Sequence, residues 1–172
     1  MSELWDVYDK NRNKTGRTTQ RGPNALKEGE YHIIVTGIIL NSKNELLLSK
    51  RAEYKKYGLM WEFNTGSVLA GETSIEGVLR ELNEELGVRF TEKDAIYYKE
   101  IKRKEFPSDF KDIWLFKKDI DISKLTFPDG ETIEAKWVTI EELLKMIENK
   151  ETIPHLDFGI DDYEKIIKIK KK

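Results

Sequence analysis

The chain has 172 residues, a length that predicts a single domain with a sizeable hydrophobic core. Its 30 basic and 32 acidic residues give a net charge of −2, which argues against general binding to nucleic acids or membranes. The absence of cysteine excludes disulfides, thiolate metal sites and cysteine nucleophiles. Because the sequence shows neither a bilayer-spanning apolar run nor a signal peptide, we expect a cytoplasmic protein.

An N-terminal β-hairpin is the first predicted element. Residues 4–8 alternate in polarity and carry aromatic side chains, as is typical of a short strand. Residues 9–16 have turn composition, and residues 17–20 return as the second arm. Together with a loop at 21–29, the hairpin forms an extension ahead of a core at residues 30–172. This hairpin offers a contact surface for a homodimer.

Strands are predicted on both sides of a central helix. Residues 31–40 are rich in β-branched side chains, which is typical of a buried strand, and residues 45–50 return as its neighbour. Trp61 and Phe63 lie in a further strand and are expected in the core. The later elements are strands at 96–106 and 112–120, a turn at 127–130, a short strand near Trp137, and helices from Thr139 and over 160–169. The order predicts a mixed α/β domain.

The segment from Gly66 to Val88 carries the most specific signal. It begins as a glycine-containing loop and continues as an amphipathic helix, with Thr73 and Glu76 as a capping box and Gly87 as the stop. Apolar residues at helical spacing place one face of this helix on a core, namely Ile75, Val78, Leu79, Leu82 and Leu86.

Three glutamates share the opposite face of the same helix. Glu81, Glu84 and Glu85 stand at i, i+3 and i+4, so their side chains converge within one turn. Like charges at this spacing cost roughly a few tenths of a kcal/mol per pair, so helix stability does not explain them. A hard divalent cation such as Mg²⁺ or Mn²⁺ would make the clustering of these glutamates favourable, because such ions prefer carboxylate oxygens as ligands. A solvated acidic surface is the alternative for the three glutamates taken alone.

The fixed positions of this segment resemble the Nudix box. Gly66, five residues, Glu72, seven residues and then Arg80-Glu81-Leu82-x-Glu84-Glu85-x-Gly87-Val88 follow its spacing throughout. The chain is therefore similar to the Nudix hydrolases, which implies an α/β (α+β) fold: an α/β/α sandwich with a mixed sheet between helices, here with an added N-terminal hairpin. The resemblance also implies hydrolysis of a phosphoanhydride bond in a nucleoside diphosphate linked to another moiety, by a water that Mg²⁺ or Mn²⁺ activates.

The resemblance assigns roles to individual box residues. Glu81, Glu84 and Glu85 are the implied metal ligands and catalytic residues, and Arg80 orients their carboxylates. The general base is one of these glutamates or a carboxylate from a later loop, and the sequence leaves that choice open. The implied surroundings of the metal also include Gly66, Glu72 and, from a later strand, Glu131.

The loop before the box supplies candidate substrate contacts. Arg51 and Lys55 are cationic and Tyr54 is aromatic, and all three lie in the predicted loop at 51–60. Such side chains suit substrate phosphates and a flat group, respectively. Ordinary surface positions are the alternative for each of them.

Two other functions are weighed against hydrolysis. The N-terminal hairpin and His32 resemble the branch related to isopentenyl diphosphate isomerase, but that activity needs a cysteine and a histidine-rich metal site. This chain has no cysteine and only His32 and His155, so isomerisation is disfavoured. A non-catalytic nucleotide-binding Nudix module is the second alternative. Such modules typically lose box carboxylates, and none is lost here.

Overall fold

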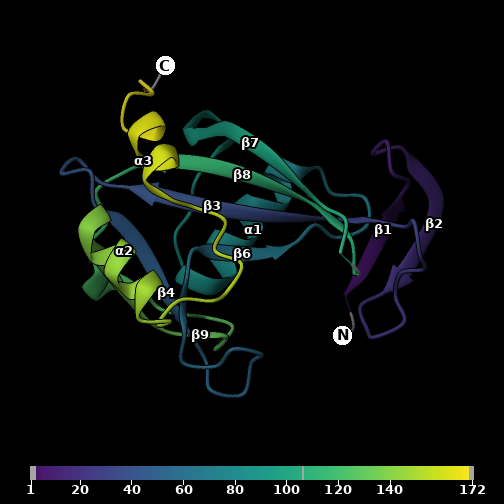
Figure 1. Ribbon diagram of the computed structural model, residues 1–172, viewed down its shortest axis with the longest axis horizontal. Helices are drawn as coiled ribbons and strands as arrows, with labels where there is room; N and C mark the ends of the chain where they lie inside the picture. Colours follow the sequence, from purple (N-terminus) through teal and green to yellow (C-terminus); the bar gives the residue numbers. More distant parts are fainter. Residues whose placement is uncertain (1–2, 106, 171–172) are drawn as a thin grey trace.

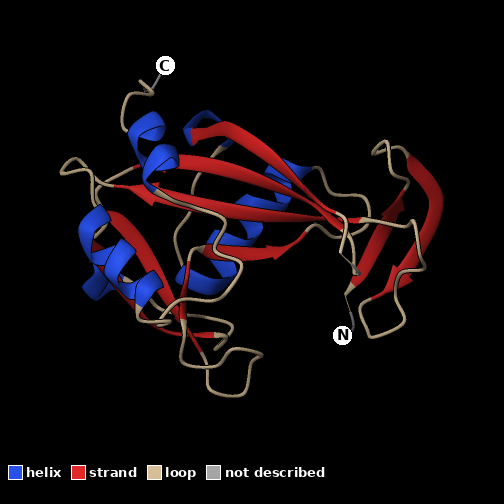
Figure 2. Ribbon diagram, in the orientation of Figure 1, coloured by secondary structure: helices blue, strands red, loops and turns tan. Residues whose placement is uncertain are grey.

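A mixed β-sheet lies between helices in the computed structural model, which describes residues 3–105 and 107–170 (Figures 1 and 2). Helix α1 covers one face of the sheet, and α2 and α3 pack on the other. The strands are β1 (Leu4–Tyr8), β2 (Lys14–Gln20), β3 (His32–Leu40), β4 (Leu46–Arg51), β5 (Trp61–Glu62), β6 (Asn64–Ser67), β7 (Ala95–Arg103), β8 (Asp109–Lys117) and β9 (Thr132–Val138). The helices are α1 (Ser74–Leu86), α2 (Ile140–Glu148) and α3 (Ile160–Ile166), with short 3₁₀ turns at Glu92–Asp94 and Ile122–Lys124. Within the described parts of the chain, none of the helices is long and apolar enough to cross a membrane.

Strand β3 is the centre of the sheet. It pairs in parallel with β8 along its whole length and antiparallel with β6 over four residues. Strand β4 follows β3 by a tight turn and pairs with both β5 and β9, while β7 pairs antiparallel with β8. This arrangement brings the segment before α1 (β6) and the segment before β9 towards the same part of the sheet (Figure 1).

Helix α1 has the predicted ends. The Thr73 side chain accepts from the Glu76 backbone amide, and Glu76 accepts in return from the Thr73 amide, so the capping box is complete. Gly87 ends the helix in the left-handed conformation at φ 69°. The helix comes close to the sheet at Gly37, where an added Cβ would lie 3.1 Å from a methyl carbon of Leu82. A glycine at this position therefore lets α1 rest on β3.

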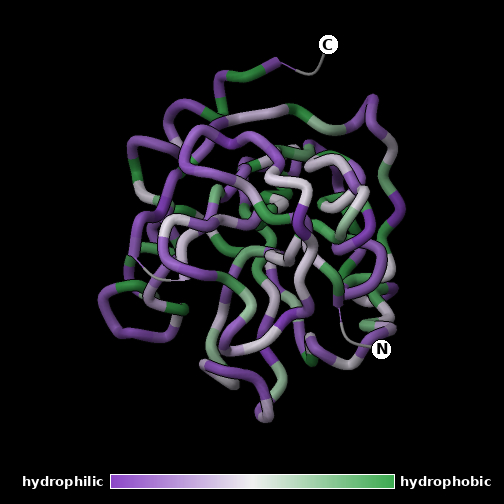
Figure 3. Tube along the Cα trace, turned by 90° about the vertical axis from the view of Figure 1, so that its right-hand side faces the viewer, coloured by the Kyte–Doolittle hydropathy of each residue, from purple (hydrophilic) through white to green (hydrophobic). Residues whose placement is uncertain are grey.

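Two hydrophobic clusters hold the layers together. One lies under α1, from Val35 and Phe116 of the sheet to Val78 and Leu82 of the helix. The other lies under α2 and α3 and includes Trp61 and Phe63, as the sequence predicts. In Figure 3 the outer loops are mainly hydrophilic, and hydrophobic stretches run through the middle of the molecule. Successive side chains of β3 point alternately into the two clusters, which explains why nearly every residue of that strand is buried.

The N-terminal hairpin has its own small core and is fastened to the loop that leads into α1. Trp5, Val7, Ala25 and Leu26 are buried together, with Leu69 of that loop packed against them. Two hydrogen bonds from backbone amides join the parts: Ala70 N–H donates to the Leu4 carbonyl at 2.7 Å, and Gly71 N–H donates to the Asp6 carboxylate at 2.9 Å. The hairpin therefore has a fixed position next to the box.

Several element boundaries differ from the sequence prediction. Strand β2 already begins at Lys14, inside the predicted turn, and α3 ends at Ile166. Strand β8 begins at Asp109, which the sequence assigned to a break, because Arg103 of β7 donates to both of its carboxylate oxygens and makes its burial tolerable. Strand β9 extends well ahead of Trp137, because β4 offers it a full-length neighbour. Phe106, the last residue of a predicted strand, lies outside the described residues.

Candidate functional site

A pocket of about 270 Å³ lies beside the glutamate face of α1. Its lining residues come from parts of the chain that are far apart in sequence. The lining residues are Glu3, Arg21, Ile34, Arg51, Lys55, Thr65, Gly66, Ser67, Glu81, Glu84, Glu85, Asp129 and Glu131. Glu81, Glu84 and Glu85 therefore line one pocket, together with the two cations predicted from the preceding loop.

Arg80 holds two of the three box glutamates. Its Nη1 donates to Glu81 at 2.9 Å and to Glu84 at 2.9 Å. On its other side, Nε donates to Glu72 at 2.8 Å, and Nη2 donates to the Ser67 carbonyl at 2.8 Å. The predicted orienting role thus has a geometric basis, because one guanidinium fixes three carboxylates and the loop before the helix.

Gly66 lets strand β6 pass directly over Glu81. A Cβ built on Gly66 would lie 1.9 Å from Glu81 Cδ and 2.1 Å from Oε1, closer than atoms can approach. The glycine of the box therefore makes room for a glutamate side chain. This need for space cannot be recognised from turn chemistry, which is the usual reason for a loop glycine.

Glu85 is the most deeply buried of the three, at 2% exposure. The side-chain amide of Asn64 donates to one of its oxygens, and the Lys55 ammonium lies 3.9 Å from the other. The Oδ1 atom of Asn64 is itself buried and has no hydrogen-bond partner among the described residues. A carboxylate this deep in the protein needs a compensating cation or a proton, since burial of an unpaired charge is costly.

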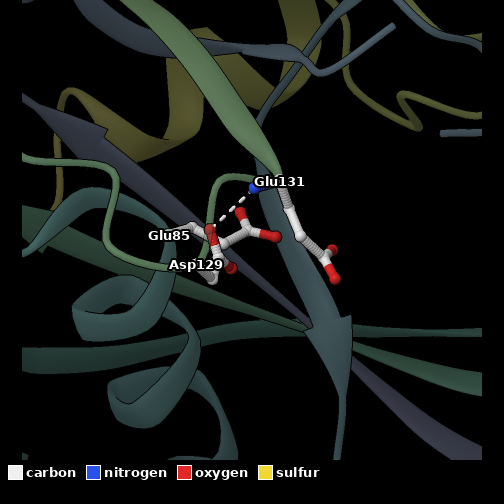
Figure 4. Close-up of side chains that lie close together, drawn as sticks. All are labelled: Glu85, Asp129 and Glu131. Carbon is white, nitrogen blue, oxygen red and sulfur yellow. Dashed lines mark hydrogen bonds between the residues drawn. The ribbon is translucent and has the colours of Figure 1, made fainter. Parts of the chain in front are cut away.

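Glu85 forms a group with two carboxylates from the segment before β9 (Figure 4). One oxygen each of Glu85, Asp129 and Glu131 can be chosen so that all lie within 4.8 Å of one another. The segment is fixed to α1 and to itself: Asp129 N–H donates to Glu84 O at 3.2 Å, and Glu131 N–H donates to Asp129 Oδ1 at 2.9 Å. The Lys55 ammonium contacts Glu131, so a cation already compensates this acidic group. An all-oxygen donor set of this kind suits a hard divalent cation.

Burial dominates the electrostatics of these carboxylates. It raises the pKa of Glu81 to about 7, although Arg80 acts in the opposite direction. Burial also raises the pKa of Glu85 well above its usual value; Lys55 opposes this, while Glu62, Glu81 and Asp129 add repulsion. The pKa of Asp129 is raised for the same primary reason. Several carboxylates with raised pKa values in one pocket are typical of a functional site.

The predicted substrate contacts are only partly in the pocket. Arg51 and Lys55 line it, and Arg51 is paired with the buried Glu62. Tyr54 does not line it: its side chain is 74% exposed, and its hydroxyl donates to the Gly130 carbonyl at 3.3 Å. His32 is also absent from the pocket lining, because it is buried and stacks on Trp5 with ring centroids 4.1 Å apart.

Asp129, Asn64, Glu3 and Arg21 are among the residues of the site that the sequence did not single out. Asp129 was assigned only to a turn, although its spacing from Glu131 was a visible signal. Asn64 has no sequence signal, because its importance comes from the burial of Glu85. Glu3 and Arg21 belong to the extension before the core, and only the docking of the hairpin brings them to the pocket.

Fold and pocket together define a mixed α/β domain with an acidic centre carried by a helix. Residues 30–156 match the NUDIX domain family. An uncharacterised Nudix hydrolase of Listeria monocytogenes is 36% identical over 159 residues, covering 89% of each chain. The chain belongs to the Nudix family and is a Nudix hydrolase.

Solved structures agree with the fold. The crystal structure of DR0079 from Deinococcus radiodurans matches with a TM-score of 0.69 at 24% identity, covering 87% of this chain and 91% of that one. The NUDIX domain of Shewanella oneidensis NrtR, solved in complex with ADP ribose, matches with a TM-score of 0.64 at 15% identity, covering 86% of this chain and 94% of that one. The predicted α/β/α sandwich is therefore confirmed.

Proposed function

We propose that this chain hydrolyses a phosphoanhydride bond in a nucleoside diphosphate linked to another moiety. The observation that carries the proposal is the convergence of six carboxylates and three cations on one pocket beside α1. Phosphates need positive charge around them, and a water needs a nearby base, so a pocket with both kinds of group suits this reaction. Family membership supports the same reaction class.

We further propose that Glu85, Asp129 and Glu131 hold Mg²⁺ or Mn²⁺, with Glu81 and Glu84 beside them as direct or water-mediated ligands. The donor set fits, because its oxygens lie within 4.8 Å of one another and the burial of Glu85 calls for a cation. When bound, the ion supplies charge neutralisation on the phosphates and lowers the pKa of a water. Gly66 and Glu72 contribute indirectly, by making room for Glu81 and by anchoring Arg80.

The other side chains of the pocket orient the carboxylates, bind the substrate phosphates and accept a proton. Arg80 keeps Glu81 and Glu84 in place and reduces their mutual repulsion. Arg51 and Lys55 bind phosphate oxygens, and Lys55 exchanges its carboxylate partner for the substrate as the pocket fills. One of the pocket carboxylates accepts the proton of the attacking water. Tyr54 has no part in this scheme, since it lies outside the pocket lining.

Turnover on a substrate panel tests the proposal. Nucleoside diphosphates linked to a sugar, a second nucleoside or another group are incubated with Mg²⁺ or Mn²⁺, and the products are identified by mass spectrometry. We expect a nucleoside monophosphate and a phosphorylated second product, and no reaction with EDTA. Binding of these nucleotides without turnover would refute hydrolysis and favour a non-catalytic module instead.

A further inference from the structure

The N-terminal hairpin brings a cation to the pocket that the proposed scheme does not use. Arg21 follows the last residue of β2 and lines the pocket together with Glu3, which precedes β1. The two residues are joined by a backbone hydrogen bond from Arg21 N–H to Glu3 O at 2.8 Å. Because the hairpin is fastened to residues 70 and 71 of the loop before α1, this cation has a defined place relative to the box.

Arg21 differs from the other arginines of the hairpin in how its guanidinium is used. Arg12 is bonded to both oxygens of Asp112 and to Glu100, and Arg17 is bonded to both oxygens of Glu30 and to the Ala25 carbonyl. The Arg21 side chain is 55% exposed, and Glu3, at 3.0 Å, is its one hydrogen-bond partner among residues 3–105 and 107–170. An arginine has five N–H donors, so most of those of Arg21 face the pocket or solvent without a protein acceptor.

The three cations that line the pocket also differ in how far they are already paired. Arg51 is paired with the buried Glu62, and Lys55 is held between Glu85 and Glu131. Arg21, by contrast, is paired with the partly exposed Glu3, and both residues line the pocket together with Glu81. A diphosphate in the pocket therefore meets two cations that already have buried or part-buried carboxylate partners, and Arg21, whose guanidinium is largely available.

We propose that Arg21 is a substrate-binding residue that takes a phosphate oxygen of the diphosphate, in exchange for Glu3. This inference rests on the proposed function, because it concerns the same pocket and the same substrate class. Arginine suits the role because its planar fork binds two oxygens of one phosphate at once. The N-terminal extension, which lies outside the matched family segment 30–156, is then part of the binding site.

The test is calorimetric titration of the full chain with inorganic pyrophosphate in the presence of Mg²⁺. We expect Arg21→Ala to weaken pyrophosphate binding by about tenfold or more, and Arg21→Lys to fall between that variant and the wild type. Glu3→Gln should bind as tightly as the wild type or more tightly, since it removes a competing carboxylate. A purely structural Glu3–Arg21 pair would instead make both variants weaker.

Lys14→Ala is the matched control. Lys14 is a hairpin cation with 52% exposure and a single carboxylate partner, Asp6, but it does not line the pocket. This variant should bind pyrophosphate like the wild type, and melting temperatures of all variants should agree within a few degrees. Unchanged binding in Arg21→Ala, an equal loss in Lys14→Ala, or no binding by the wild type would each overturn the proposal.

Turnover separates this inference from the proposed function. With the best substrate of the panel, Arg21→Ala should raise KM while leaving kcat nearly unchanged, because binding is lost without a change in the chemical step. A drop in kcat with constant KM would count against a binding role. If the wild type binds pyrophosphate through Arg21 but cleaves no substrate, the hydrolase proposal fails and the assignment of Arg21 stands.

Discussion

Gly66→Ala tests whether the close passage of β6 over α1 is what positions Glu81. The new methyl carbon would lie 1.9 Å from Glu81 Cδ, whereas carbon atoms in contact stay about 3.5–4 Å apart. The backbone at this position does not have a positive φ, so strain of the main chain is not the issue. Relief must come from the Glu81 side chain, which has to leave its site.

The Gly66→Ala substitution should lower the free energy of unfolding only modestly. Moving Glu81 breaks its 2.9 Å bond to Arg80, a hydrogen bond between charged groups worth about 1.5–3 kcal/mol. Replacing glycine returns about 0.4–1 kcal/mol by restricting the unfolded chain. We therefore expect the free energy of unfolding to fall by about 1–2 kcal/mol, the difference between these two terms. The fold survives such a change.

The cost in activity should be much larger. Removal of a group that stabilises charge in the transition state lowers kcat by about a hundredfold or more. Displacement of the Glu81 carboxylate from its site should have an effect of the same order. The assay compares kcat on the best panel substrate with urea denaturation of the same sample. Gly22→Ala is the control, because nothing lies within 4 Å of a Cβ added there. Wild-type kcat in Gly66→Ala would refute the reasoning.

Three further outcomes follow from the same geometry. Arg80→Met leaves Glu72, Glu81 and Glu84 without their shared partner, so urea denaturation should show a loss of about 3 kcal/mol without metal. Mg²⁺ should then raise the melting temperature of Arg80→Met more than that of the wild type, and equal increments would contradict this. Burial lowers the pKa of His32 from 6.5 to about 4, so the folded state resists its protonation. The stability that His32 contributes is complete above pH 6.5 and is lost as pH falls towards 4. Lowering the pH from 7 to 5 should therefore reduce the free energy of unfolding by about 2 kcal/mol. His32→Gln should abolish this part of the pH dependence of stability. Gly87→Ala places a side chain at φ 69° and 2.2 Å from Thr126 Oγ1, so it should destabilise by about 1–2 kcal/mol in denaturant titration while kcat stays unchanged.

Local patterns predicted the parts of the fold that local interactions decide. The limits of α1 were predictable because Thr73, Glu76 and Gly87 satisfy the ends of the helix by themselves. Boundaries that depend on a distant partner were less predictable. Strand β8 extends back to Asp109 because Arg103 of the neighbouring strand pairs with it, and no pattern within the segment reveals this.

The same distinction holds for the pocket. Glu81, Glu84 and Glu85 could be recognised together because they are neighbours on one helix. Asp129 and Asn64 join them only through tertiary contacts. The backbone N–H of Asp129 donates a hydrogen bond to the Glu84 carbonyl, and the side-chain amide of Asn64 donates one to the buried Glu85. Arg21 reaches the pocket because a whole hairpin docks on the loop before α1. Tyr54 shows the converse: it is the sequence neighbour of the pocket residue Lys55, yet its own side chain does not line the pocket.

The kcat of Glu85→Gln tests the central claim most directly. The new side chain keeps the size of Glu85 and removes a buried charge, so the variant should fold with a melting temperature at or above that of the wild type. Because the buried carboxylate is lost, kcat with Mg²⁺ should fall by about a hundredfold or more on every panel substrate. A folded Glu85→Gln protein that turns over within a few fold of the wild type would show that the reaction does not depend on this carboxylate.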